Sequence, residues 1–211
     1  MKKIIAVDGP AGAGKSTVSK IVAQKLGYTY IDTGAMYRAV ALKSSQSCDD
    51  LMMIIDDINI ELDDKARVFL DGQDVTKEIR TPEISKLASD VSKFGFVRKR
   101  LTELQRQMAE RGAVIMDGRD IGTQVLPNAD LKIFLTASLE ERARRRFEEL
   151  KAKGQEVDFE KTKTEMALRD KQDSEREIAP LKQADDAILI DSTELTIEEV
   201  VAQILSLCST R

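Results

Sequence analysis

Residues 9–17 combine glycines, a lysine and hydroxyls at a spacing that suits phosphate chemistry. The stretch Gly9-Pro10-Ala11-Gly12-Ala13-Gly14-Lys15-Ser16 fits the pattern G-x-x-x-x-G-K-[ST]. Glycines allow positive φ, so the backbone can wrap around an anion and point its N–H groups at the oxygens. The lysine reaches the β- and γ-phosphates of a nucleoside triphosphate, and the next hydroxyl binds Mg²⁺. We therefore expect MgATP to be held by Gly9, Pro10, Ala11, Gly12, Ala13, Gly14, Lys15, Ser16 and Thr17, with Lys15 also catalytic.

Two predicted elements hold this loop. Residues 3–7 are an apolar run that ends at Asp8, which is typical of a buried strand. From Lys15 to Leu26 apolar side chains recur at helical spacing, and Gly27 is well placed to end that helix. A helix that begins at the loop turns the positive end of its dipole toward a bound phosphate. This order of strand, loop and helix favours a phosphate-binding loop over a glycine-rich turn without a ligand.

The rest of the chain alternates between apolar runs and amphipathic segments. We predict further strands at 28–31, 113–116, 131–135 and 188–190. We predict helices at 35–42, about 97–111, 138–153, 159–175 and 197–207, and one that Thr81 caps and Pro82 begins. Strands separated by helices form right-handed crossovers in a parallel sheet. The predicted fold class is α/β, with a five-stranded parallel sheet flanked by helices.

Residues 58–77 depart from this alternation. Ile58, Ile60 and Leu62 alternate with polar residues, and Asp71-Gly72 follows the next apolar run as a strong hairpin-turn signal. This pattern predicts a small antiparallel sheet inserted in the α/β chain.

Charged side chains follow the later strands, where a second substrate would bind. Segment 32–38 follows the second predicted strand, and segment 117–120 follows the third. Ligands of parallel α/β proteins bind at the carboxyl ends of the strands, so Arg119 is a candidate for binding the transferred phosphate. Asp117 ends an apolar strand, and we expect it to face Mg²⁺ together with Ser16.

Arginines also crowd the two late helices. One predicted helix carries Arg142, Arg144, Arg145 and Arg146, and the next carries Arg169, Asp173 and Arg176. A kinase needs such cations to neutralise the transferring group and to bind its acceptor. The competing interpretation is a solvated charged surface, because acidic residues nearly balance the basic ones on the first of these helices.

Composition excludes several other classes of protein. The chain of 211 residues has no histidine, which removes histidine-based triads and histidine-ligated zinc. Its net charge of −4 is unlike that of a general nucleic-acid binder. Cys48 and Cys208 stand in no C-x-x-C spacing and are expected to be free thiols in a reducing compartment. No apolar run is long enough for a membrane helix, and we expect a cytoplasmic protein without membrane or nucleic-acid partners.

Further features separate this chain from other proteins with the same loop. The asparagines Asn59 and Asn128 do not begin the N-K-x-D motif by which GTPases read guanine. Motor ATPases and helicases are larger and carry coupling elements. A short chain with this loop near its beginning fits a small-molecule kinase best.

Three segments together resemble the bacterial cytidylate kinases, a family of nucleoside monophosphate (NMP) kinases. They are residues 5–16, residues 32–38 (Asp-Thr-Gly-Ala-Met-Tyr-Arg) and residues 117–123 (Asp-Gly-Arg-Asp-Ile-Gly-Thr). Segment 78–81 and the helix after residue 135 are also similar. The loop alone is unspecific, but its combination with the other two segments is highly specific.

The resemblance implies a role for each matching residue. It implies that the cytosine is read by Ser89, Arg98 and Asp120, and that the sugar is held by Arg169 and Asp173. It implies that the phosphates are bound by Arg38, Arg119 and Arg176, and that Thr33 and Tyr37 line the acceptor site. We expect the catalytic cations to be Lys15, Arg119, Arg144 and Arg176.

The same resemblance implies transfer of the γ-phosphate of ATP to CMP or dCMP. It implies one domain over residues 1–211, with an NMP-binding insert at about 34–111 and a helical lid at about 142–176. We expect a monomer. Two alternatives stay open, namely a kinase for another small acceptor such as UMP or AMP, and a regulatory or RNA-binding module that uses the loop as a switch.

Overall fold

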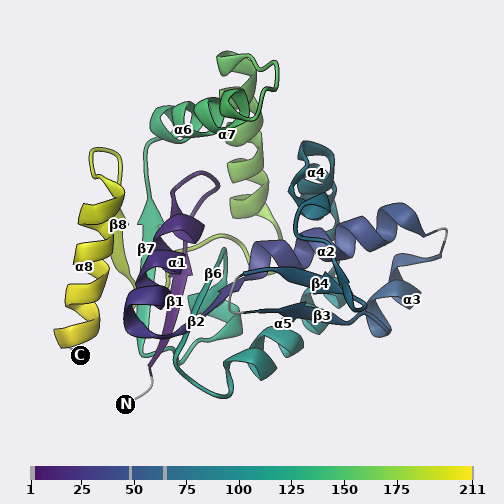
Figure 1. Ribbon diagram of the computed structural model, residues 1–211, viewed down its shortest axis with the longest axis horizontal. Helices are drawn as coiled ribbons and strands as arrows, with labels where there is room; N and C mark the ends of the chain where they lie inside the picture. The colour runs from purple at the N-terminus through teal and green to yellow at the C-terminus, as the bar shows by residue number, and fades with distance from the viewer. Residues whose placement is uncertain (1–2, 48, 64–65, 211) are drawn as a thin grey trace.

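A parallel five-stranded sheet forms the centre of the protein in the computed structural model, which describes residues 3–47, 49–63 and 66–210. Its strands are β1 (Ile4–Asp8), β2 (Thr29–Asp32), β6 (Val114–Gly118), β7 (Leu131–Thr136) and β8 (Ile188–Asp191). They lie in the order β2-β6-β1-β7-β8, and every neighbouring pair is parallel (Figure 1). The predicted sheet is therefore confirmed, and the first strand lies at its centre.

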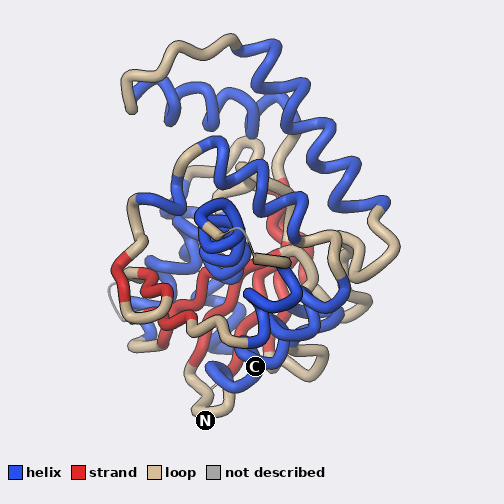
Figure 2. Tube along the Cα trace, turned by 90° about the vertical axis from the view of Figure 1, so that its right-hand side faces the viewer, coloured by secondary structure: helices blue, strands red, loops and turns tan. Residues whose placement is uncertain are grey.

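Helices cover both faces of this sheet, as Figures 1 and 2 show. Ile5 and Val7 of β1 pack with buried residues of α1 (Lys15–Leu26) and α8 (Ile197–Thr210) in one core. Ala6, between them, belongs to a second core with α2 (Thr33–Gln46), α4 (Pro82–Val91) and α5 (Gly95–Ala109). Side chains that alternate along a strand face opposite sides of a sheet, which explains why nearly every residue of β1 is apolar.

Most helix ends agree with the capping signals. Gly27 ends α1 in the left-handed conformation with φ of 67°, and the side chain of Thr81 accepts a hydrogen bond from the N–H of Ile84 at the start of α4. The second helix begins earlier than the predicted residue 35. The Asp32 carboxylate accepts a hydrogen bond from the N–H of Ala35, so this N-cap adds the first turn, with Thr33, to α2.

The predicted antiparallel insert is present. Strands β3 (Ile60–Leu62), β4 (Val68–Leu70) and β5 (Gln73–Asp74) form a separate sheet in that order. Asp71 and Gly72 join β4 to β5 with φ values of 50° and 83°, as a two-residue hairpin turn requires. Two short elements beside it were not predicted, the helix α3 (Leu51–Asp56) and the 3₁₀ turn η1 (Glu78–Arg80).

The two charged helices form one projecting unit. Helices α6 (Leu139–Ala152) and α7 (Phe159–Glu175) pack against each other and lie above the loop between β1 and α1, at the top of Figure 1. Arg142 joins this unit to the loop, since its guanidinium donates a hydrogen bond to the carbonyl of Ala11 at 3.1 Å. That the unit acts as a lid stays a prediction.

Neither a disulfide nor a membrane-spanning helix shapes the part of the chain that the structure describes. Cys208 is a free thiol, and Cys48 lies outside the described residues. In the portions of the chain that the structure describes, none of the helices has the length and apolar character needed to cross a bilayer.

Candidate active site

The phosphate-binding loop leaves β1 and enters α1 in a shape that requires glycine. Gly9 has a φ of 148°, and a Cβ placed on it would lie 1.9 Å from the carbonyl oxygen of Leu135 on the neighbouring strand. A Cβ on Gly12 would lie 2.8 Å from Cε of Met166 and 3.2 Å from Cβ of Arg142. The loop is therefore packed between the sheet below and helices α6 and α7 above.

Lys15 is the buried cation of this loop. Its ammonium donates a hydrogen bond to the carbonyl of Pro10 at 2.7 Å. Burial, followed by the nearby positive charge of Arg119, lowers the pKa of Lys15 to about 7. A bound phosphate would restore the charged form, because an anion favours the ammonium.

Ser16, Asp117 and Tyr30 form a chain of short hydrogen bonds at the ends of β6 and β2. The Ser16 hydroxyl donates to one oxygen of Asp117 at 2.8 Å, and the Tyr30 hydroxyl donates to the other at 2.7 Å. Burial, and then the neighbouring Asp32, raises the pKa of Asp117. This set fits Mg²⁺, which prefers oxygen ligands and uses few protein side chains. Among the described residues no cluster of three or more cysteines or acids could hold a metal alone.

Three arginines from separate elements come together on the predicted acceptor side, two of them predicted to bind its phosphate and the third its sugar. Arg38 on α2 is paired with Asp32 at 3.1 Å, and Arg119 after β6 is paired with Asp173 at 3.0 Å. Arg169 on α7 is the third. Burial, and then the positive charge of Arg119, lowers its pKa to about 10.

Two N–H donors of this arginine cluster are not satisfied. The Nε atoms of Arg38 and Arg169 are buried and have no hydrogen-bond partner within the described part of the chain. A buried donor without a partner costs roughly 1–3 kcal/mol, and like charges brought together add to the cost. An acceptor with several oxygens and negative charge would relieve both, which is the property of a phosphate group.

A second network joins the residues that the resemblance assigns to the base. Arg98 on α5 contacts one oxygen of Asp120 at 2.5 Å, and Arg176 at the end of α7 lies 3.5 Å from the other. The guanidinium of Arg98 lies 5.5 Å from the ring centroid of Tyr37. Burial disfavours the charge of Arg98, but Tyr37 and Asp120 outweigh it, and its pKa is raised.

Ser89 completes this region from α4. It lines a pocket of about 350 Å³ together with Asp173 and Arg176. Burial would raise the pKa of Asp173, but Arg119 and Arg169 more than offset it and lower that pKa. The structure thus brings Tyr37, Ser89, Arg98, Asp120, Asp173 and Arg176 from four helices and one strand end into one region.

Thr33 and Arg144 differ in how they relate to these clusters. The Thr33 hydroxyl donates to the backbone carbonyl of Asp117 at 2.7 Å, so it lies beside the residue that is predicted to face Mg²⁺. Arg144 is half exposed on α6 and is paired with Glu141 and Glu148 of the same helix. The structure does not bring it to the loop. The arginine of α6 nearest Gly14 is Arg145, 3.9 Å from where a Cβ of that glycine would stand.

Comparison with known proteins decides the family. The family model described as cytidylate kinase matches residues 5–210. A cytidylate kinase of Caldicellulosiruptor bescii is 58% identical over 98% of this chain and 96% of the relative, and one of Bacillus licheniformis is 52% identical over the same shares. The chain belongs to the cytidylate kinase family.

Members of this family are phosphotransferases, so the predicted class of enzyme is confirmed. Membership also implies nucleotide substrates and ATP as the donor. The shikimate kinase of Bacteroides thetaiotaomicron shares the fold, with a TM-score of 0.54 at 15% identity over 98% of each chain. That likeness supports the α/β kinase architecture and nothing about the substrate.

Sequence reasoning missed three residues that contact and support the predicted site. Tyr30 and Asp32 support Asp117 and Arg38, and Asp8 accepts hydrogen bonds from the backbone after Asp120. Each lies at the carboxyl end of a parallel strand or close to it. That position was the available signal, but it does not show which partner a side chain will meet.

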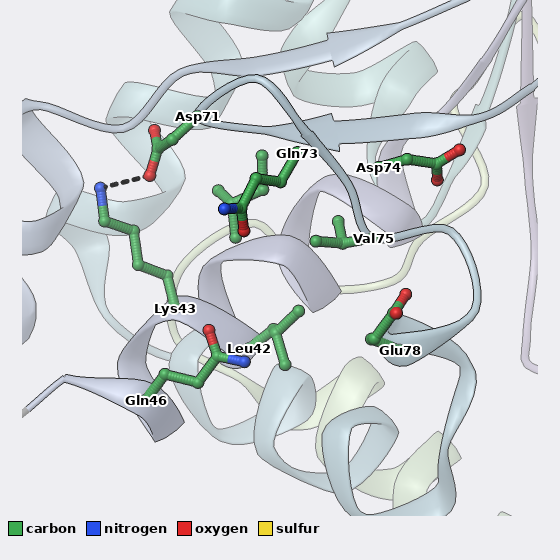
Figure 3. A pocket seen from close by; sticks show the side chains of 9 residues that line it. Leu42, Lys43, Gln46, Asp71, Gln73, Asp74, Val75 and Glu78 are labelled. Atoms are coloured by element: carbon green, nitrogen blue, oxygen red, sulfur yellow. Dashed lines mark ion pairs between the residues drawn. The ribbon is translucent and has the colours of Figure 1, made fainter.

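A further pocket of about 440 Å³ lies in the insert of the protein, between α2 and the β4–β5 hairpin. Figure 3 shows Lys43 of α2 reaching the carboxylate of Asp71 in the hairpin turn, and the two are 2.8 Å apart. This pocket holds no residue of the predicted site. The ion pair instead fastens the insert to α2, the helix that carries Tyr37 and Arg38.

Proposed function

We propose that this protein transfers the γ-phosphate of ATP to CMP or dCMP, giving ADP and CDP or dCDP. The observation that carries the proposal is the adjacency of two anion sites, one at the loop around Lys15 and one at Arg38 and Arg119, beside Arg169. Arg119 lies close enough to Lys15 to lower its pKa. A phosphate bound at each site would therefore lie beside the other, as direct transfer requires.

On the donor side, the backbone of residues 9–17 binds the triphosphate and Lys15 neutralises its β- and γ-oxygens. When bound with the triphosphate, Mg²⁺ would supply further positive charge beside the transferring group. Ser16 would hold that ion, and Asp117 would orient the Ser16 hydroxyl through the hydrogen bond at 2.8 Å. Tyr30 fixes the other oxygen of Asp117 and so sets the direction of the carboxylate.

On the acceptor side, Arg38, Arg119 and Arg176 bind the phosphate of the monophosphate. Arg169 and Asp173 hold the sugar, and Thr33 and Tyr37 line the same site. The unsatisfied Nε atoms of Arg38 and Arg169 would gain partners on binding. These interactions orient the attacking oxygen, which is largely ionised at pH 7 because the second pKa of a phosphate monoester is about 6, so no general base is needed.

Ser89, Arg98 and Asp120 recognise the base. Cytosine has an exocyclic amine that a carboxylate can accept, and ring acceptors to which an arginine and a serine can donate. Uracil has a carbonyl in place of the amine, so Asp120 would meet another acceptor. Such a mismatch costs roughly 1–3 kcal/mol, which favours CMP over UMP by about tenfold or more.

The transfer is in line, without a covalent enzyme intermediate. Lys15 and Arg119 lie at the junction of the two sites, where they stabilise the charge on the γ-phosphoryl group as it moves. Arg176 contributes from the acceptor side, and the lid helices exclude water that would hydrolyse ATP. For Arg144 to take part, as its place in the arginine-rich helix predicts, the guanidinium would have to leave both of its ion pairs on α6.

An assay of ADP release across CMP, dCMP, UMP, AMP and shikimate tests the proposal. We expect kcat/KM for CMP and dCMP to exceed the value for UMP by about tenfold or more, with little turnover of AMP or shikimate. A preference for UMP, AMP or shikimate would identify a different acceptor. ATP hydrolysis at one rate with every acceptor would favour a regulatory switch.

We also propose that the enzyme acts as a monomer in the cytoplasm, without nucleic-acid or membrane partners. The acidic net charge of −4 supports the first exclusion. Light scattering of the purified protein near 23.5 kDa would support a monomer, whereas twice that mass would contradict it.

A further inference from the structure

The segment after Asp120 forms a single turn of π-helix, Ile121–Val125. The carbonyl of Asp120 accepts hydrogen bonds from the N–H groups of Gln124 and Val125, at 2.8 and 3.2 Å, and that of Ile121 accepts one from Leu126 at 2.7 Å. Such turns are rare and occur mostly at functional sites. This one directly follows the two residues, Arg119 and Asp120, that the proposed function places on the acceptor.

Asp8 holds the beginning of this turn. Its carboxylate is buried, and its two oxygens accept hydrogen bonds from the N–H groups of Ile121 and Gly122 at 2.8 and 2.7 Å. Gly122 fits here because a Cβ would lie 3.1 Å from the side chain of Lys132 and 3.3 Å from Asp8 itself. Asp8 ends β1 and directly precedes the phosphate-binding loop, yet its hydrogen bonds go to the acceptor side.

Arg106 holds the end of the same turn. Its guanidinium donates to the carbonyls of Gln124 and Val125, at 2.8 and 2.9 Å. Arg106 stands eight residues after Arg98 on α5, about two turns along one face. One helix thus supplies both the partner of the Asp120 side chain and the partner of the backbone that follows it.

We propose that Asp8 and Arg106 are positioning residues, which clamp the π-turn from both ends and thereby fix Asp120 for base recognition. This inference rests on the proposed function, since it assumes that Asp120 reads the acceptor base. A carboxylate at position 8 is needed because two N–H groups converge on it. An asparagine offers one oxygen, and its amide would point a donor at the remaining N–H.

The test uses the full chain with Asp8→Asn and Arg106→Gln, and with Lys99→Gln, on the exposed face of α5, as the control. The readouts are KM for CMP, the ratio of kcat/KM between CMP and UMP, and Kd for ATP in the absence of acceptor. We expect each clamp variant to raise KM for CMP about tenfold and to lower the CMP-to-UMP ratio several-fold. Kd for ATP should stay within about twofold, and Lys99→Gln should resemble the wild type.

A loss of ATP affinity with unchanged CMP discrimination in both variants would overturn the inference, because Asp8 would then serve the neighbouring loop. Unchanged kinetics in both would overturn it as well. Arg106 lies at the surface, so Arg106→Gln decides the matter if Asp8→Asn does not fold. Failure of the proposed function itself would look different, since the wild-type enzyme would then show no preference for CMP.

Discussion

The donor and acceptor sides of this site are built in different ways. The proposed donor side is one continuous stretch, in which β1, the loop and α1 follow each other. The acceptor side is assembled from side chains of α2, α4, α5, α7 and the end of β6, which lie far apart in the sequence. The donor side is therefore defined by local conformation, whereas the acceptor side depends on the packing of the whole chain.

The donor and acceptor sides also differ in how their charged side chains are paired. Among the described residues, the hydrogen-bond partner of the Lys15 ammonium is the backbone carbonyl of Pro10, and burial lowers the pKa of Lys15 to about 7. On the acceptor side, Asp120 and Asp173 each face more than one arginine. In the proposed function the counter-charge for Lys15 comes from the nucleotide, whereas the acidic and basic side chains of the acceptor side pair with one another.

The largest effect is expected from Lys15→Met. The proposed function places Lys15 at the transferring phosphate, so its loss should lower kcat by about 10²- to 10³-fold, as removal of one charge-stabilising donor does in other enzymes. Binding of CMP, measured by calorimetry, should change little, because the acceptor side does not use this residue. Lys25→Met at the exposed end of α1 is the control, and equal losses in both variants would contradict the assignment.

Arg98→Met should instead damage the acceptor side and the fold together. It leaves the buried carboxylate of Asp120 with Arg176 alone, at 3.5 Å. Removing one partner of a buried pair costs about 3 kcal/mol, which for a chain of this size lowers Tm by roughly 6–12 °C. We expect KM for CMP to rise at least about tenfold while Kd for ATP is kept, as steady-state kinetics and ATP titration would show. A variant with weakened ATP binding and normal KM for CMP would break the proposed division.

The same contrast explains how much of each side can be predicted from the sequence. The loop, its strand and its helix were predicted nearly to the residue, since a glycine pattern and local periodicity determine them. The residue types of Arg98 and Asp120 do not predict which side chains they contact. The roles of both residues were taken from the family resemblance. The π-turn and its contacts with Asp8 and Arg106 were not foreseen, because they join β1, α5 and the end of β6, which no local pattern connects.

Asp8 joins the two sides, and its ionisation gives a pH signature. Burial raises its pKa from 3.8 to about 6, even though the N–H groups of Gly122 and Ile121 oppose the shift. The folded state thus keeps a proton that the unfolded chain releases between these values. This carboxyl therefore adds stability at low pH, and the contribution is lost as pH rises through about 6.

Thermal unfolding of the wild type and Asp8→Asn at pH 5 and pH 7 checks this sign. From pH 7 to pH 5 the wild type should gain about 1 kcal/mol relative to the variant, or roughly 2–4 °C in Tm. A Tm difference that stays constant, or that shrinks at pH 5, would show that the Asp8 pKa is not raised.

The smallest effect is expected within the lid. Arg144→Ala removes an exposed side chain that pairs only with its own helix among the contacts described, so kcat should fall by less than about threefold. Arg145→Ala should cost more, because that guanidinium donates to the carbonyl of Ser192 and lies near Gly14. Single-turnover rates of both variants give the comparison, and a larger loss for Arg144→Ala would show that the lid rearranges to bring that residue to the phosphate.

The most direct test of base recognition is the ratio of kcat/KM between CMP and UMP in the wild type and in Asp120→Asn. The ratio is unaffected by the fraction of active enzyme, which matters because the variant also loses ion pairs. The exposed carboxylate variant Asp90→Asn serves as the matched control. We predict a wild-type preference for CMP of about tenfold or more, and near equality or a preference for UMP in Asp120→Asn, whose amide can donate to the uracil carbonyl. An unchanged preference in Asp120→Asn would contradict the account.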